Sequence, residues 1–493
     1  MKKLLLLFVL HALPGCLFAQ IAIGETSYEL LTDAIGASVS GDVIKISGPV
    51  ILTEQAGLAH ATGVRTFKGV TPDASITLAT GARFIMEAAG ETVFEDLTLI
   101  GAEQAHEDWG ALLVLFNGPT LILRNDTLRG AKTSAHAGAI RITSGATVEA
   151  YNTVFMENEA NQNGGVAFIE AGNTSTLFDG CVFLNNKAGV GSPDAKGGAL
   201  FYANGANMKD HIVKNSAFIG NTSSNHGGAI GMESVSPVFI NCTFSGNSTV
   251  DNGGVFWMYN SAAECTTTLV NCTLYGNEAG NGSALFMNHT TTHYDVRNSV
   301  ITDTESAEIS SAEMPATIAI TNSYFPVLPE GLTVSSGVKN INTGDLFLAD
   351  VNPSEGINWH EVTSWRSVLV GLGSTSLLKA YSHTDQTGAE RDMDKTTITS
   401  GAYEYAGPGL ILGTDESEKT QLAVYPNPAS HYIIIKTPSR SSVSIYNTNG
   451  ALVLRQDLKE GENIIDTSHY SKSVYIVKNK RGKQTDLARF VVK

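Results

Sequence analysis

Residues 215–230, NSAFIGNTSSNHGGAI, contain the pattern that decides the fold. The stretch opens with an asparagine that precedes an apolar strand, continues through Phe-x-x-Asn, and ends in a Gly-Gly pair that opens the next strand. An asparagine, or an equivalent residue, followed by an apolar strand recurs along the chain at intervals that average about 28 residues. The nine positions are Asp96, Asn125, Asn152, Gly180, Asn215, Asn241, Asn271, Asn298 and Asn322.

The other two features keep the same spacing, so the region repeats one structural unit. Phe-x-x-Asn recurs at Phe155/Asn158, Phe183/Asn186, Phe218/Asn221 and Phe244/Asn247, with Leu274/Asn277 as a variant. The small-residue pair recurs at Gly164-Gly165, Gly197-Gly198, Gly227-Gly228, Gly253-Gly254 and Gly282-Ser283, with weaker forms at Ala137-Gly138 and Trp109-Gly110.

Each unit holds two or three short strands rich in β-branched and aromatic residues, separated by Gly, Asn and Ser turns, and lacks helical periodicity. One unit cannot bury its apolar face, whereas stacked units pair every strand with the coils above and below. We therefore predict an all-β fold, a right-handed single-stranded parallel β-helix, with a sandwich or propeller as the alternative. Inward positions should form ladders of like residues, such as Phe155, Phe183, Phe218 and Phe244. Corner asparagines and glycines should adopt left-handed conformations.

The composition is typical of a secreted β-rich protein. Of 493 residues, 16% are charged, 42% are hydrophobic and 49 are glycine. The hydrophobic content argues against a disordered chain. The net charge of −16 disfavours nucleic acid as a partner. Residues 419–493 carry 12 Lys+Arg and 5 Asp+Glu, a net of +7, so the remaining residues carry −23 and a basic module follows an acidic body.

Residues 1–19 have the pattern of a secretory signal peptide, because two lysines precede the apolar run 4–10 and small residues follow. We expect cleavage after Ala19. The alternative is a lipobox-like reading of residues 13–16, which would leave a lipidated Cys16.

Ordinary cleavage leaves four cysteines without a CxxC pair, which argues against a zinc site. Cys181, Cys242 and Cys272 occupy the same position of the repeat, so we expect them to stack in the core as small apolar residues. Cys242 and Cys272 should lie on neighbouring coils as free thiols.

The ends of the solenoid need caps. Ser27 is expected to cap a short helix that holds Leu30, Leu31, Ala34 and Ile35 as a lid over the first coil. Residues 41–46 read as the first full strand.

The repeats resemble those of polymorphic outer-membrane proteins, because residues 227–230 read Gly-Gly-Ala-Ile and Phe-x-x-Asn accompanies them over about residues 96–322. That resemblance implies a surface-adhesion role. Asp385, Gly388, Arg391 and the Gly-Ala-Tyr-Glu of residues 401–404 resemble the closing segment of anchored bacterial β-helix proteins called choice-of-anchor Q. Ser400 departs from that pattern, in which an acidic residue precedes Gly-Ala-Tyr-Glu.

Beyond a Gly/Pro-rich and acidic linker, alternating strands are expected at 432–436, 443–446, 452–455, 474–478 and 490–493, which predict a small Ig-like β-sandwich. The segments VYPNPA at 424–429, VSIYNTNG at 443–450, VYIV at 474–477 and the terminal FVVK resemble a type A sorting domain of the type IX secretion system. The resemblance implies transport across the outer membrane by that machinery. It also implies removal of the domain by a sortase-like peptidase, and attachment of the body to surface lipopolysaccharide or its release.

These observations divide the chain into four parts: a signal peptide at 1–19, a β-helix body with its cap at 20–406, a linker at 407–418 and a sorting sandwich at 419–493.

Parallel β-helices include polysaccharide lyases and hydrolases, so clusters of charged residues are candidate sites. A lyase of this fold needs a Lys, Arg or His base beside carboxylates or calcium. Lys209, Asp210, His211 and Lys214 come nearest, but they fall in the one 35-residue interval, where we expect an inserted solvated loop.

A hydrolase needs paired carboxylates close together. Glu390, Asp392 and Asp394 alternate with Arg391 and Lys395, and we expect an exposed charged segment there.

Two groups invite a metal interpretation. His289, His293 and Asp295 could ligate a metal only from a loop, because the two histidines would lie about 13 Å apart on an extended strand. The second group is an acidic turn, expected to be solvated rather than to bind calcium, and consists of Glu103, His106, Glu107 and Asp108.

Phe256, Trp257 and Tyr259 could form an exposed aromatic patch for glycans, but alternation along a strand favours core packing for about half of them. We therefore assign no catalytic, cofactor-binding or metal-ligating residues and expect no cofactor. The sequence favours an exported structural, adhesive or glycan-binding surface protein, whose ligand would be a glycan or a host or cell-surface molecule. A polysaccharide lyase is the alternative.

Overall fold

The structure is a computed structural model. It describes residues 20–58, 63–102, 104–170, 172–203, 211–260, 264–302, 308–313, 316–325, 332–334, 345–364, 366–378, 381–405, 424–425, 429–447, 452–481 and 484–492. The predicted signal peptide and linker lie outside these residues. Within them, no helix is long and apolar enough to cross a membrane.

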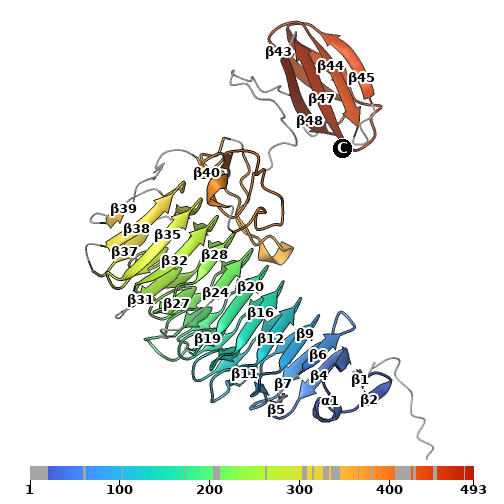
Figure 1. Cartoon of the computed structure of the whole chain (residues 1–493). Coiled ribbons are helices and arrows are strands. Elements are labelled where there is room, and N and C mark those ends of the chain that lie inside the picture. The colour runs from blue at the N-terminus through green and yellow to red at the C-terminus, as the bar shows by residue number, and fades with distance from the viewer. Residues whose placement is uncertain are drawn as a thin grey trace, which may run out of the picture. The chain divides into compact units, whose positions relative to one another are not determined.

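The prediction of a parallel β-helix is confirmed: between residues 43 and 321 the strands of successive coils pair in parallel with one another (Figure 1). Three long sheets form the walls. Sheet A contains β1 (Gln20–Ile23), β2 (Thr26–Tyr28), β3 (Val43–Ser47), β6 (Val64–Gly69), β9 (Glu91–Glu95), β12 (Thr120–Arg124), β16 (Thr147–Tyr151), β20 (Ser175–Asp179), β24 (His211–Lys214), β28 (Val238–Ile240), β32 (Cys265–Val270), β35 (Thr292–Arg297), β38 (Ala316–Thr321) and β39 (Leu332–Val334).

Sheet B contains β4 (Pro49–Leu52), β7 (Ser75–Leu78), β10 (Thr98–Ile100), β13 (Thr127–Arg129), β17 (Val154–Met156), β21 (Val182–Leu184), β25 (Ala217–Ile219), β29 (Thr243–Ser245), β33 (Thr273–Tyr275) and β36 (Val300–Thr302). Sheet C contains β5 (Ala56–Gly57), β8 (Phe84–Met86), β11 (Leu113–Leu115), β15 (Ile140–Ile142), β19 (Ala167–Ile169), β23 (Leu200–Tyr202), β27 (Ile230–Glu233), β31 (Phe256–Tyr259), β34 (Leu285–Met287) and β37 (Ile309–Ser311). A short sheet D contains β14 (Lys132–Thr133), β18 (Glu159–Ala160), β22 (Lys187–Ala188), β26 (Thr222–Ser223) and β30 (Ser248–Thr249).

The predicted phenylalanine ladder fills the interior behind sheet B. Phe155, Phe183, Phe218 and Phe244 are fully buried and lie in direct register on successive strands. Their rings stack nearly parallel, with centroids 4.3 to 4.9 Å apart. Large apolar side chains of equal size therefore recur every coil because each ring packs on its own counterpart.

Residues at the corner between sheets A and B have positive φ throughout, as predicted. The values run from 47° at Asn298 to 69° at Gly180. Asparagine tolerates this left-handed conformation better than other side chains, and glycine adopts it without strain. The corner sequence is therefore fixed by backbone geometry.

The second asparagine of each repeat lies inside the solenoid, not at a corner. Asn158, Asn186, Asn221, Asn247 and Asn277 are buried and bond one another from coil to coil. The Gly-Gly pairs also have a geometric cause, because a Cβ at the second glycine of a pair, such as Gly228, would lie 2.2 Å from a carbonyl of the next coil.

The N-terminal cap consists of β1, β2 and α1 (Leu31–Ala37), which buries Leu31, Ala34 and Ile35 as predicted. The prediction that Ser27 caps this helix is wrong. Leu30 occupies the N-cap position and is 52% exposed, and Ser27 lies in β2.

Residues 345–405, here called the flap, contain η1 (Pro353–Glu355), β40 (Gly373–Ser374), η2 (Thr375–Leu377) and β41 (Thr397–Ile398). The flap, orange in Figure 1, packs against the side of the last coils. Its core residues Val362, Leu369 and Leu372 contact Val300 and Tyr324. The segment predicted to close the solenoid thus covers part of its flank.

The contacts divide the chain into two compact units, residues 1–407 and 408–493. The second unit is the predicted small sandwich of antiparallel sheets. One sheet contains β42 (Val424–Tyr425), β43 (Tyr432–Thr437) and β46 (Gly461–Asp466), and the other contains β44 (Ser441–Asn447), β45 (Leu452–Leu458), β47 (Val474–Arg481) and β48 (Gln484–Val491). The sequence interpretation missed β46, because Ile464 is exposed and Ile465 is buried, which leaves only one inward apolar residue.

Candidate functional site

The outer face of sheet C carries aromatic side chains. On β31, Phe256 and Met258 point into the core, and Trp257 points the other way, so the expectation that only some of these aromatics pack inside is confirmed. The Trp257 ring is 4% exposed. It stacks nearly parallel to His226, at 4.9 Å between centroids, and to Tyr259, at 6.0 Å.

Lys196 lies over this group. Its Nζ is 4.9 Å from the centre of the Trp257 ring and 3.4 Å from Glu233 Oε1. Gly231 separates Phe201 from Trp257 in the register of the sheet, and a Cβ at Gly231 would approach the Phe201 ring to 2.8 Å. The glycine therefore creates the space that Lys196 and Phe201 occupy.

A similar group lies on earlier coils of the same face. The Arg141 guanidinium is 4.5 Å from the Trp109 ring centre and pairs with Glu170 at 2.8 Å. His136 lies between Trp109 and Phe168, at 4.4 and 4.7 Å between centroids. Burial lowers the pKa of His136 to about 4 and also lowers the pKa of His226, so both rings are neutral at pH 7.

We call these residues the aromatic stripe: Trp109, His136, Phe168, Phe201, His226, Trp257 and Tyr259. Sequence reasoning identified only its last two members. His136 and His226 stand directly before a small-residue pair, and Trp109 opens the weak pair Trp109-Gly110. Phe168 and Phe201 stand three residues after a pair, as Trp257 does, and this shared position was the signal for them.

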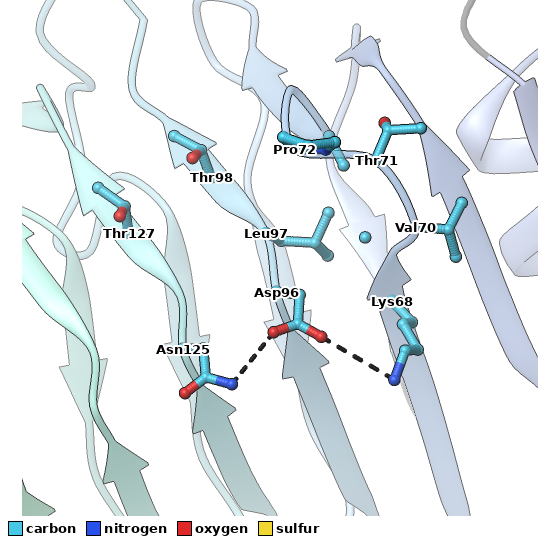
Figure 2. A pocket seen from close by; sticks show the side chains of 11 residues that line it. Lys68, Val70, Thr71, Pro72, Asp96, Leu97, Thr98, Asn125 and Thr127 are labelled. Atoms are coloured by element: carbon cyan, nitrogen blue, oxygen red, sulfur yellow. Dashed lines mark hydrogen bonds and ion pairs between the residues drawn. The ribbon is translucent and has the colours of Figure 1, made fainter. Parts of the chain in front are cut away.

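A groove of about 620 Å³ lies at the corner between sheets A and B on the early coils (Figure 2). Asp96 lies between Asn125, which donates to it at 3.1 Å, and Lys68, whose Nζ is 3.9 Å away. Thr98 and Thr127 supply hydroxyls. Val70, Pro72 and Leu97 supply apolar walls, which completes a mixed surface of the kind that ligand sites use.

The described residues of the lyase candidate, His211 and Lys214, point to opposite faces of one strand. Lys209 and Asp210 lie outside the described residues. His211 and Lys214 belong to β24 rather than to a solvated loop, so that prediction is wrong for them. His211 is buried and bonds Thr176 Oγ1 at 2.9 Å, whereas Lys214 is partly exposed and pairs with Asp179 at 3.0 Å. Alternation along the strand sends the two side chains to opposite faces.

The flap carboxylates Glu390, Asp392 and Asp394 are exposed as expected, and Lys395 pairs with Asp392 at 3.2 Å. Arg391 between them is buried, which corrects the expectation of a uniformly exposed segment.

Arg391 pairs with Glu404 and donates to the carbonyl of Gly401 at 3.0 Å. Asp385 accepts the backbone N–H groups of Glu404 and Ala389. The residues that resemble choice-of-anchor Q thus form a polar core that holds the flap together.

The metal candidates are spread apart. His289 lies in the turn before β35, not on the strand, and its Nε2 is 3.7 Å from Glu313. His293 and Asp295 share the outer face of β35, where Asp295 pairs with Arg297. No cluster of three or more His, Cys, Asp or Glu suited to a metal occurs among the described residues.

In the acidic turn, Glu103 lies outside the described residues and Asp108 pairs with Arg83 at 3.2 Å. The backbone carbonyl of Glu107 accepts a hydrogen bond from Ser134 Oγ at 3.2 Å. His106 forms a bridge with Thr133 on the next coil, so this turn joins coils.

A parallel β-solenoid followed by an antiparallel sandwich defines a repeat body with a separate terminal module. Residues 423–493 match the family model described as the secretion system C-terminal sorting domain. The chain therefore carries a type IX sorting domain, which marks it for export across the outer membrane to the cell surface or the extracellular space. No curated protein matched the chain.

Proposed function

We propose that the solenoid is a structural and adhesive surface protein that contacts glycans through the aromatic stripe of sheet C. The observation that carries the proposal is the stripe itself, in which aromatic rings alternate with paired charges along one face. Ligand sites for sugars and other small polar molecules combine aromatic surface with a few fixed polar groups. The partly exposed Trp109 and Tyr259 would supply ring surface, and Lys196 and Glu233 would supply hydrogen bonds.

The other outward charges support a structural role. Lys68–Glu95, Lys132–Glu159 and Lys214–Asp179 are ion pairs between neighbouring coils, with N–O distances of 2.9, 3.7 and 3.0 Å. Each partly exposed pair contributes at most about 1 kcal/mol, and together they join several neighbouring coils. These charged side chains therefore stabilise the stacking of the coils.

The test is binding of the purified full chain to a panel of neutral and anionic polysaccharides. Tyr259→Ser and Trp109→Ser should each weaken binding several-fold. Tyr151→Ser, which removes a partly exposed ring from the outer face of sheet A, is the matched control and should leave binding unchanged. Equal binding by all variants would contradict the proposal. Release of unsaturated uronate products, followed by ultraviolet absorbance, would establish the lyase alternative instead.

For export, we propose that the sorting module is removed at the cell surface by a sortase-like peptidase and that lipopolysaccharide anchors the body. The match to the sorting family supports recognition by the type IX machinery. In this proposal the body is residues 20–406, the linker is residues 407–418 and the sorting module is residues 419–493.

A further inference from the structure

The flap is held by corner asparagines that bond its backbone directly. Asn241 Nδ2 donates to the carbonyl of Thr384 at 2.8 Å. Asn298 makes a two-point contact, because its Nδ2 donates to the carbonyl of Ser374 at 3.0 Å and its Oδ1 accepts the Ser374 N–H at 2.8 Å. Asn322 Nδ2 donates to the carbonyl of Leu372 at 3.0 Å. The corner of the solenoid is therefore a surface that recognises extended polypeptide.

Threonines of sheet B complete this surface. Thr273 Oγ1 accepts the N–H of Ala402 at 2.9 Å, and Thr243 Oγ1 donates to Gln386 Oε1 at 2.6 Å. Each threonine follows a corner asparagine by two residues. Asn241-Cys242-Thr243 is the Asn-x-Thr unit in which both side chains bond the flap. Asn271 instead donates to Asn241, so Thr273 alone of its unit bonds the flap.

The same unit recurs at the groove of Figure 2, on coils that the flap does not contact in any described bond. Asn125-Asp126-Thr127 matches it, and Asp96-Leu97-Thr98 is a variant with a carboxylate at the corner. The register of sheet B places Thr127 in the column of Thr243 and Thr273. The intervening coils replace threonine in that column by Val154, Val182 and Ala217.

The Asn125 amide has bonding capacity left for a ligand. Its Nδ2 donates to Asp96 at 3.1 Å, and the described contacts give it no flap carbonyl of the kind that Asn241 holds. An amide nitrogen carries two hydrogens, so one remains for a carbonyl. The carboxylate of Asp96, 43% exposed, can accept a backbone N–H.

We propose that this corner groove binds an extended peptide segment of a partner protein, in the way that the later corners bind the flap. Asn125 would donate to a peptide carbonyl, Asp96 and Thr127 would bond peptide N–H groups, and Val70 with Pro72 would contact a side chain. The proposal does not rest on the glycan contact of sheet C, because the groove lies at the junction of sheets A and B.

The probe is a fluorescent synthetic peptide of residues 381–390, the part of the flap that meets Asn241 and Thr243, titrated into the full chain. We expect saturable binding that Asn125→Gly weakens about tenfold, the effect of losing one or two hydrogen bonds. Glycine suits this corner, since Gly180 occupies the equivalent position with φ 69°. Thr127→Val, which reproduces Val154 in the same column, should also weaken binding.

Asn215→Gly is the matched control, because it removes the same corner amide three coils beyond the groove, where that amide bonds Asp179 and Asn241. It should leave peptide binding unchanged. Binding that is absent in the wild type, unaffected by Asn125→Gly and Thr127→Val, or weakened equally by Asn215→Gly would overturn the proposal. Thermal melts of the three variants show that each remains folded.

Discussion

Asn186 Nδ2 donates to Asn221 Oδ1 at 2.9 Å inside the solenoid, and the backbone N–H of Asn186 donates to the same oxygen at 3.1 Å. Asn221 in turn donates through Nδ2 to Asn247 Oδ1 and to the carbonyl of Phe183, both at 2.9 Å. The side-chain oxygen of each asparagine thus accepts hydrogen bonds from the coil before it. The side-chain nitrogen donates to the asparagine of the next coil and to a backbone carbonyl. These hydrogen bonds explain why a ladder of polar side chains is stable although it is buried in the solenoid.

Asn221→Asp should destabilise the solenoid by roughly 3–5 kcal/mol, because it removes two buried donors and introduces a carboxylate that faces carbonyl oxygens. The measurement is the midpoint of denaturant unfolding. Asn281→Asp changes an exposed asparagine that bonds Asn252 at 3.0 Å and serves as the control, with an expected shift near zero. Similar midpoints for the two variants would show that the interior ladder is not a source of stability.

Asp126 should make stability depend on pH. It is 1% exposed and accepts the N–H groups of Leu97 and Arg124, yet burial raises its pKa to about 7. Since the unfolded value is about 3.9, the folded state binds the proton more tightly. Its contribution to stability is therefore complete below about pH 4 and is lost as the pH rises to about 7.

The informative variant is Asp126→Ser, because Ser216 and Ser299 accept the equivalent backbone N–H at the same position of their coils. Relative to wild type, the variant should gain stability between pH 4 and pH 8, by an amount on the order of 2–4 kcal/mol. Unfolding midpoints at the two pH values measure this difference. An identical pH profile for wild type and variant would contradict the shifted titration.

The cysteines should be unreactive in the folded protein. Cys181, Cys242 and Cys272 are buried free thiols, and burial raises the pKa of Cys181 to about 12 and that of Cys242 well above its ordinary value. Since the thiolate is the reactive form, iodoacetamide at pH 8 should leave these three unmodified. After unfolding without reductant, intact mass should show modification at all four cysteines of a chain that begins after Ala19. A lower number would indicate a disulfide.

Much of the solenoid could be predicted because one physical requirement recurs in every coil. Phe183 and Phe218 stack on their counterparts, and Gly228 permits the close approach of the next coil, so both positions repeat in the sequence. The interior position of Asn221 was harder to predict from the sequence, because a polar residue in a turn-rich segment is typical of a corner. Its burial depends on partners that only stacking supplies.

The flap and the buried position of His211 on sheet A could not be derived in this way. Arg391 occurs once and lies among exposed charges, and its burial depends on carbonyls and Glu404 that fold around it. His211 stood next to a charged run, but strand pairing with β20 places it inside. Predictions from a sequence pattern depend on its periodicity, and residues outside the repeat show no periodicity.

Export should depend on the sorting module, which folds around its own core. Its apolar residues form a core of their own, which includes Ile433, Ile445, Val477 and Phe490. Deletion of residues 419–493 should therefore leave a folded body that stays in the periplasm, because the matched sorting signal is gone. Cell fractionation with protease protection measures this result, and normal surface display of the deleted chain would contradict it.

The same signal should require a folded sandwich. Ile445→Asp places a charge in the module's core and should block export, whereas Ser442→Asp, on the partly exposed side of the same strand, should not. In the wild type, the surface species should lack the module, with cleavage between Ala406 and Leu422. Mass spectrometry of C-terminal peptides decides this point. Recovery of the terminal Phe490-Val491-Val492-Lys493 from the surface species would show that the module is retained, and export of Ile445→Asp would show that an unfolded segment suffices.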